Sequence, residues 1–218
     1  MSTFYTKLGL EINLKKTKVI IFNKRGITLE NKFNFYLNGT KLVITDQYQY
    51  LGIKLRPSGS LKLSTEELHD KASRAWFGIS NTIFKNKRME CDKALGIFDS
   101  LITPIATYAC AFWLPYIISK AGFLSLEKLM ESWGNLKAET LNQRCCRMFL
   151  SVHSKASRLA VLGELGRYPL FINALSQCLT YKLSLLKRRT QTNLIGHVLT
   201  EMENMVENGQ DCWLTRIS

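Results

Sequence analysis

The chain has 218 residues, of which 46 % are hydrophobic and 22 % are charged, a composition close to that of ordinary globular domains. This composition excludes a disordered tail, a collagen-like fibre and a coiled-coil rod, and the length allows one large domain or two small ones. Thirty Lys and Arg residues against 17 Asp and Glu residues give a formal net charge of +13, which indicates polyanions as partners.

The first part of the chain is predicted to form short strands joined by turns. The Asn38-Gly39 pair, which follows alternating apolar residues, predicts a tight hairpin because both turn residues need a positive φ. The expected strands lie at Lys18–Phe22, 33–37, Lys41–Thr45 and Gln47–Leu55. The turn-rich run at 57–60 ends this part, which we expect to be a small antiparallel meander.

From Ser64 onward the sequence predicts helices. Ser64 or Thr65, followed by two glutamates, fits an N-terminal cap, and apolar residues then recur at spacings of three and four. Further helices are expected over Cys91–Tyr116, Ser125–Phe149, Ala156–Leu162, Pro169–Arg189 and Leu194–Val206. The predicted fold class is α+β, with an antiparallel hairpin unit at residues 1–62 and a mainly helical body at residues 63–218.

Cysteines and one uncharged stretch bear on the environment of the protein. The cysteines lack the spacing of a disulfide framework or a zinc site, and no secretory signal opens the chain, so we expect reduced packing groups in an intracellular protein. Residues 100–119 carry no charge and approach the length of a membrane span, although a helix inside a bundle would look the same. A basic helical protein that associates with membranes or with other proteins is therefore an alternative reading.

The basic residues are clustered, and the residues that usually support catalysis are not. Residues 7–25 hold six Lys and Arg residues against one Glu, and residues 137–189 hold ten against two. Such clusters can contact phosphates without reading bases. The five aspartates are scattered, the histidines are isolated, with His69 expected on the surface, and no phosphate-binding loop occurs. The residues alone indicate a basic α+β protein that binds a polyanion.

Four segments occur in a characteristic order. They are GLEINLKKTKV at Gly9–Val19, YQYLGI at Tyr48–Ile53, PIATY at Pro104–Tyr108 before Trp113, and LGELGRYPL at Leu162–Leu170. In order and spacing they resemble reverse transcriptases of non-LTR (LINE-type) retrotransposons. The first is similar to the G-L-x-x-N-x-x-K-T segment of that family, and the second to its Y-x-Y-L-G hairpin. The last two resemble the thumb region and the stretch beyond it.

The resemblance implies roles for particular residues. The first segment matches motif D of the family, and Lys16 aligns with the lysine that would donate a proton to the leaving pyrophosphate or neutralise its charge. Asn13 and Thr17 would order this loop. The second segment matches motif E, the primer grip, in which a tight hairpin presses on the backbone of the growing strand. The residues that match this motif are Tyr50, Leu51 and Gly52.

The resemblance also implies what this chain lacks. The F/Y-x-D-D aspartates of the family precede motif D, and no room for them exists before Gly9. We therefore expect a carboxy-terminal fragment without the Mg²⁺ site of the parent family, without cofactor or small-molecule substrate, and inactive as an RNA-directed DNA polymerase. Its expected partner is an RNA or DNA primer–template, held through sequence-independent backbone contacts. The expected contact residues are Lys15, Lys16, Tyr50, Leu51, Gly52, Lys71 and Arg74.

Overall fold

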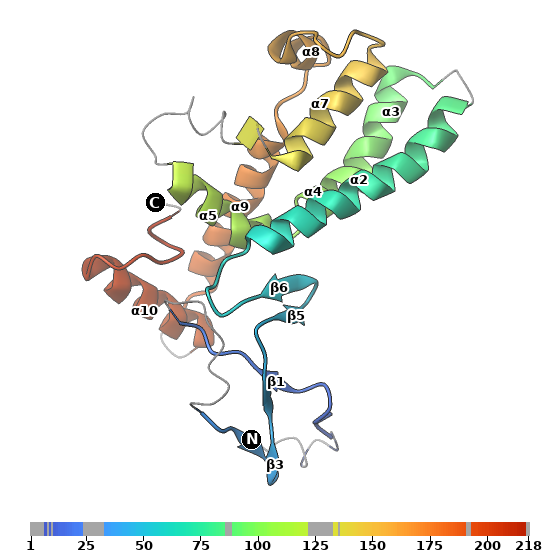
Figure 1. Cartoon of the computed structure of the whole chain (residues 1–218). Helices are drawn as coiled ribbons and strands as arrows, with labels where there is room; N and C mark the ends of the chain where they lie inside the picture. The colour runs from blue at the N-terminus through green and yellow to red at the C-terminus, as the bar shows by residue number, and fades with distance from the viewer. Residues whose placement is uncertain are drawn as a thin grey trace. The chain divides into compact units, whose positions relative to one another are not determined.

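The computed structural model describes residues 7, 9, 11–23, 33–85, 89–121, 133–134, 136–190 and 193–216, apart from the side chains of 82–85 and 119–121. The chain divides into two compact units, residues 1–64 and 65–218. Short strand pairs make up the first unit and helices the second (Figure 1). The predicted α+β class is confirmed.

The strands that the structure describes in the first unit form three separate two-stranded pairs. The antiparallel pairs are β2 (Tyr36–Leu37) with β3 (Thr40–Lys41), and β5 (Tyr48–Tyr50) with β6 (Ile53–Leu55). The third pair, β1 (Lys18–Val19) with β4 (Val43–Ile44), is parallel. The predicted meander is therefore wrong. After β4, the Thr45 hydroxyl donates to the Gln47 carbonyl at 2.8 Å and closes a turn. The next strand, β5, pairs with β6 and not with β4.

Both hairpins turn through two successive residues with positive φ values. The predicted turn between β2 and β3 is confirmed, with φ values of 50° at Asn38 and 75° at Gly39. The single strand expected over 47–55 is wrong, because Leu51 and Gly52 have φ values of 46° and 82° and fold the chain back on itself. The tight hairpin that the resemblance implied for this segment is confirmed instead.

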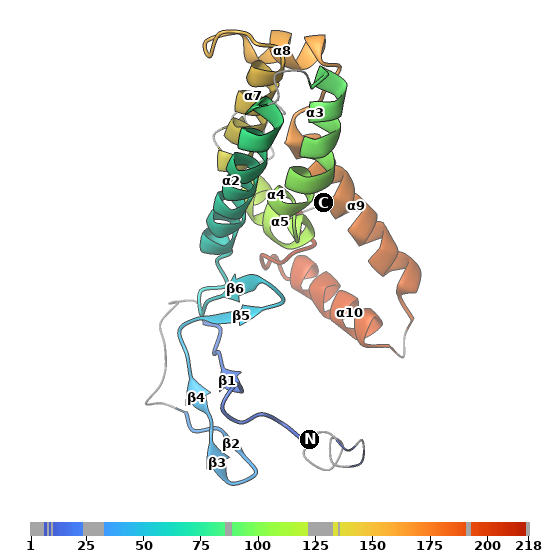
Figure 2. The same cartoon turned by 90° about the vertical axis from the view of Figure 1, so that its right-hand side faces the viewer.

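The second unit is built from helices, which are seen from two sides in Figures 1 and 2. In chain order the helical elements are α2 (Lys62–Lys85), α3 (Cys91–Ile97), the π-helix η1 (Phe98–Ile102), α4 (Thr103–Ala106), α5 (Cys110–Ala121), α7 (Lys137–Phe149), α8 (Arg158–Glu164), α9 (Leu170–Arg188) and α10 (Leu194–Glu207). The part of the predicted helix 125–149 that precedes α7 falls mostly outside the described residues.

Two predictions about helix boundaries are corrected. The helix expected over 91–116 is interrupted after α4, where Ala109 has a φ of 54° and the Trp113 indole donates to the Tyr108 carbonyl at 2.8 Å. This bond satisfies a carbonyl that the interruption leaves without a helical partner. Neither Ser64 nor Thr65 caps α2, because the helix begins at Lys62. The Ser64 hydroxyl instead accepts from the Lys54 N–H at 2.9 Å and donates to the Lys54 carbonyl at 2.7 Å.

The uncharged region does not form one membrane-length helix. Within the described residues, no single helix has both the length and the apolar character needed to cross a membrane. Residues 91–106 and 110–118 meet that test only together, as two helical stretches bent by 74°.

Large aromatic side chains form the core of the second unit. Trp113 and Trp133 stack with ring centroids 5.9 Å apart, and the Trp76 ring lies edge-on to Phe98 at 5.6 Å. His69 packs edge-on against Trp113 and is 2 % exposed, so the predicted surface position of this histidine is wrong. All six cysteines are free thiols and all but Cys91 are buried, which confirms their expected role as packing groups.

Candidate nucleic-acid interface

The first unit presents the motif-D-like segment as a closed turn. The Lys16 N–H donates to the carbonyl and to the side-chain oxygen of Asn13, both at 3.1 Å. The Thr17 N–H and hydroxyl donate to the same carbonyl at 3.0 and 2.9 Å. The expectation that Asn13 and Thr17 order this segment is confirmed. The turn leaves Lys15 and Lys16 exposed, so both ammonium groups can reach an anion.

The β5–β6 hairpin of the same unit carries Tyr50, Leu51 and Gly52, which the resemblance aligns with the primer grip. Tyr50 is 59 % exposed and Leu51 is 73 % exposed. Gly52, the second turn residue, is also exposed. Because Gly52 has no Cβ, a ligand backbone can approach closely here. The hairpin tip therefore presents an apolar surface and an aromatic ring, without a charged side chain at these three positions.

In the second unit, helices α2 and α7 lie side by side (Figures 1 and 2). Between them is a cavity of about 250 Å³, which we call the α2–α7 groove. Its lining residues are Ser73, Phe77, Lys137, Thr140, Leu141 and Arg144. Two cations, two hydroxyls and an aromatic ring in one groove are groups that bind nucleic acids.

Arg144 is the cation of the groove that is best placed to bind an anion. Its guanidinium carbon lies 5.3 Å from the centroid of the Phe77 ring. Arg144 is exposed, and Asp70 on the neighbouring helix pairs with Lys137 rather than with Arg144. Contact with the ring restricts the guanidinium, while its N–H edge can still donate two parallel hydrogen bonds to a phosphate.

Lys137 is paired with Asp70 across the groove. Its ammonium lies 2.8 Å from the Asp70 carboxylate. The hydrogen bond from Lys137 lowers the pKa of Asp70, and the same bond raises the pKa of Lys137. Both side chains are more than half exposed, so this pair contributes little to folding stability. A phosphate can therefore compete with Asp70 for Lys137.

The acidic residue of α7 does not offset the charge of the groove at the surface. The Glu139 side chain is completely buried and accepts hydrogen bonds from the Trp133 indole and the Leu170 N–H, both at 2.9 Å. Its other oxygen accepts from the Asn142 amide at 3.2 Å. Glu139 thus organises the core, and the exposed side of α7 at the groove carries positive charge.

None of the residues that line this groove was among the contact residues expected from the sequence. Lys71 and Arg74 are exposed on α2 as expected, but neither lines the cavity. Lys137, Thr140, Leu141 and Arg144 were not singled out, although spacings of three and four place them on one face of a helix. Nothing in that spacing shows which helix packs opposite. The expected contacts Lys15, Lys16, Tyr50, Leu51 and Gly52 belong to the first unit.

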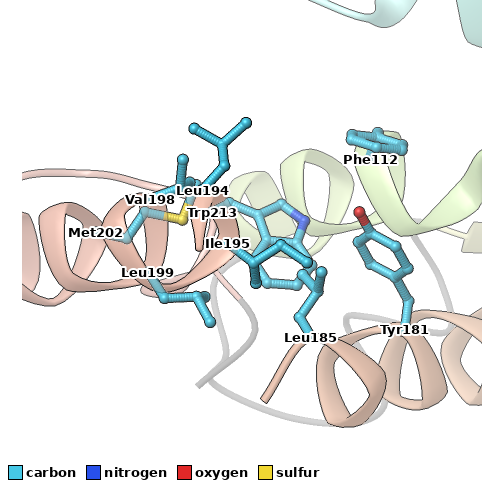
Figure 3. A pocket seen from close by; sticks show the side chains of 9 residues that line it. All are labelled: Phe112, Tyr181, Leu185, Leu194, Ile195, Val198, Leu199, Met202 and Trp213. Carbon is cyan, nitrogen blue, oxygen red and sulfur yellow. The ribbon is translucent and has the colours of Figure 1, made fainter. Parts of the chain in front are cut away.

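A second cavity in the helical unit differs in chemistry. It has a volume of about 340 Å³ and lies among α5, α9, α10 and the segment after α10 (Figure 3). Its lining residues are Phe112, Tyr181, Leu185, Leu194, Ile195, Val198, Leu199, Met202 and Trp213. None of the described residues that line it is charged, so this cavity does not suit a phosphate.

Metal-ligating residues are not gathered in the described part of the chain, where no group of three or more His, Cys, Asp and Glu residues is placed to hold a metal ion. Comparison of the chain with protein-family models, with curated proteins and with solved structures found no match.

Proposed function

We propose that this chain binds nucleic acid through the phosphate backbone, without reading the base sequence. The observation that carries the proposal is the α2–α7 groove, where Arg144 is held over the Phe77 ring beside Lys137. A phosphate placed there gains bidentate hydrogen bonds from Arg144 and the charge of Lys137. Each phosphate neutralised in this way releases counterions, which favours binding at low salt.

The resemblance to non-LTR reverse transcriptases suggests which nucleic acid is bound. We propose a primer–template, with this chain acting as a remnant of an RNA-directed DNA polymerase that grips the duplex. The closed turn at Asn13–Thr17 and the exposed β5–β6 hairpin support this proposal, because both have the local form that the resemblance implies. The proposal concerns binding and does not extend to nucleotidyl transfer.

Removal of positive charge from the groove and from the exposed basic residues of α2 tests the proposal. The Arg144→Gln variant is expected to bind a labelled RNA·DNA hybrid more weakly, by the same factor for unrelated sequences. If Arg144 contacts one phosphate, the slope of log affinity against log salt should be about one unit less steep in this variant than in the wild type. The same change in slope is expected for Lys71→Gln and for Arg74→Gln, if each of these residues contacts one phosphate. Fluorescence anisotropy over a range of salt concentrations measures both quantities.

Two further variants sharpen this test. Lys93→Gln removes one positive charge from α3, where Lys93 pairs with Glu90 at 3.0 Å, and should leave the slope unchanged. Asp70→Asn releases Lys137 and removes a negative charge beside the groove, so it should strengthen binding. If Lys93→Gln weakened binding as much as Arg144→Gln, the net charge of the molecule would account for binding and the groove would have no special role.

A further inference from the structure

We propose that the α2–α7 groove holds one unpaired nucleotide of a single strand, with its phosphate at Lys137 and Arg144 and its base on the Phe77 ring. The inference rests on the proposed function and adds to it a preference for a particular part of the nucleic acid. On a primer–template, that part is the single-stranded template beyond the duplex.

Phe77 is the residue that suggests a base. Its side chain is 48 % exposed, although it lies on the side of α2 that faces α7. An aromatic ring at the mouth of a groove offers a surface on which a base can stack, and such stacking tolerates any base sequence. Arg144 lies over one face of this ring, so the base stacks on the other face while the guanidinium contacts the phosphate.

The remaining lining residues suit the rest of a nucleotide. Leu141 is 6 % exposed and gives the groove an apolar floor. The Thr140 hydroxyl donates to the Leu136 carbonyl at 3.1 Å, which leaves its oxygen lone pairs available to accept a hydrogen bond from a sugar hydroxyl or a base amino group. Ser73, on the opposite helix, supplies a second hydroxyl.

A duplex cannot use Phe77 in this way. Inside a duplex both faces of each base are covered by the neighbouring bases, so a side chain can stack only where a base is unpaired. The phosphate contacts, by contrast, are available to both forms. The groove should therefore add affinity for a single strand beyond what its charge provides for a blunt duplex.

A pair of matched substitutions tests this inference on the full chain. Phe77→Leu keeps an apolar side chain and removes the aromatic face. Phe112→Leu makes the same change at a phenylalanine that is 54 % exposed and lines the apolar cavity. The probes are a labelled oligothymidine single strand and a blunt RNA·DNA hybrid of equal length. Phe77→Leu should weaken single-strand binding about tenfold and hybrid binding about twofold or less, and Phe112→Leu should change neither.

Each outcome separates this inference from the proposed function. Phe77→Trp keeps an aromatic face and should therefore retain the single-strand affinity. That result would show that the loss of affinity in Phe77→Leu does not come from misfolding. Equal losses for both probes, or no loss in Phe77→Leu, would overturn the inference. In that case the proposed function would still stand if Arg144→Gln weakened hybrid binding. If the wild-type chain bound neither probe at low salt, both proposals would fail.

Discussion

The Glu139→Ala variant is expected to lose about 3–5 kcal/mol of unfolding free energy, because it removes the acceptor of several buried donors. The Glu139 carboxylate is fully buried and accepts from the Trp133 indole, the Leu170 N–H and the Asn142 amide. In the variant, these three donors lose their acceptor, and the missing side chain leaves a cavity beside Trp133. Urea unfolding followed by tryptophan fluorescence measures the loss.

Two controls give this prediction its meaning. Glu139→Gln keeps the size of the side chain and one carbonyl oxygen, so its loss should be smaller than that of Glu139→Ala. Glu164→Ala removes an exposed carboxylate on α8 and should change stability by no more than about 0.5 kcal/mol. If Glu139→Ala were as stable as Glu164→Ala, Glu139 would not organise this core.

Acidification is expected to destabilise the helical unit through His69. Burial is the main cause that lowers the pKa of His69 from 6.5 to about 4, with a smaller contribution from Lys137, while Asp70 acts in the opposite direction. The unfolded chain therefore takes up this proton at a higher pH than the folded chain. Stability should fall as the pH drops from 6.5 towards 4, by about 3 kcal/mol in total from this group, since one pKa unit corresponds to about 1.4 kcal/mol.

The measurement compares wild type with His69→Phe, which can still pack against Trp113 but cannot titrate. Urea midpoints at pH 7 and pH 5 should differ less in this variant than in the wild type. The account would be wrong if His69→Phe and the wild type lost stability in parallel, because carboxylates elsewhere would then explain the effect.

Local features of the fold could be predicted from the sequence, and pairings between distant segments could not. The turn at Asn38-Gly39 was predicted because its backbone conformation depends on those two residues alone. The helices over 170–188 and 194–207 were predicted to within one residue at either end from apolar spacing. The parallel pairing of β1 with β4 depends on contacts between separate segments, which no local pattern encodes.

The same distinction explains the errors at individual side chains. His69 was expected on the surface, whereas it is buried against Trp113 on another helix. The burial of Glu139 was not predicted, because its partners include the Leu170 N–H from a helix further along the chain. In the candidate interface, Lys71 and Arg74 of α2 are exposed as expected but do not line the groove. Arg144 was missed because its partner, Phe77, lies on the opposite side of the groove.

The most direct test of the central claim is the affinity of the wild-type chain for a labelled RNA·DNA hybrid between low and moderate salt. If Lys71, Arg74, Lys137 and Arg144 each neutralise one phosphate, log affinity should fall with log salt with a slope of roughly −3 to −4. Two hybrids of unrelated sequence should give the same slope and nearly the same affinity. An affinity that does not change with salt concentration, or no binding at low salt, would contradict the claim that these four basic residues bind a phosphate backbone.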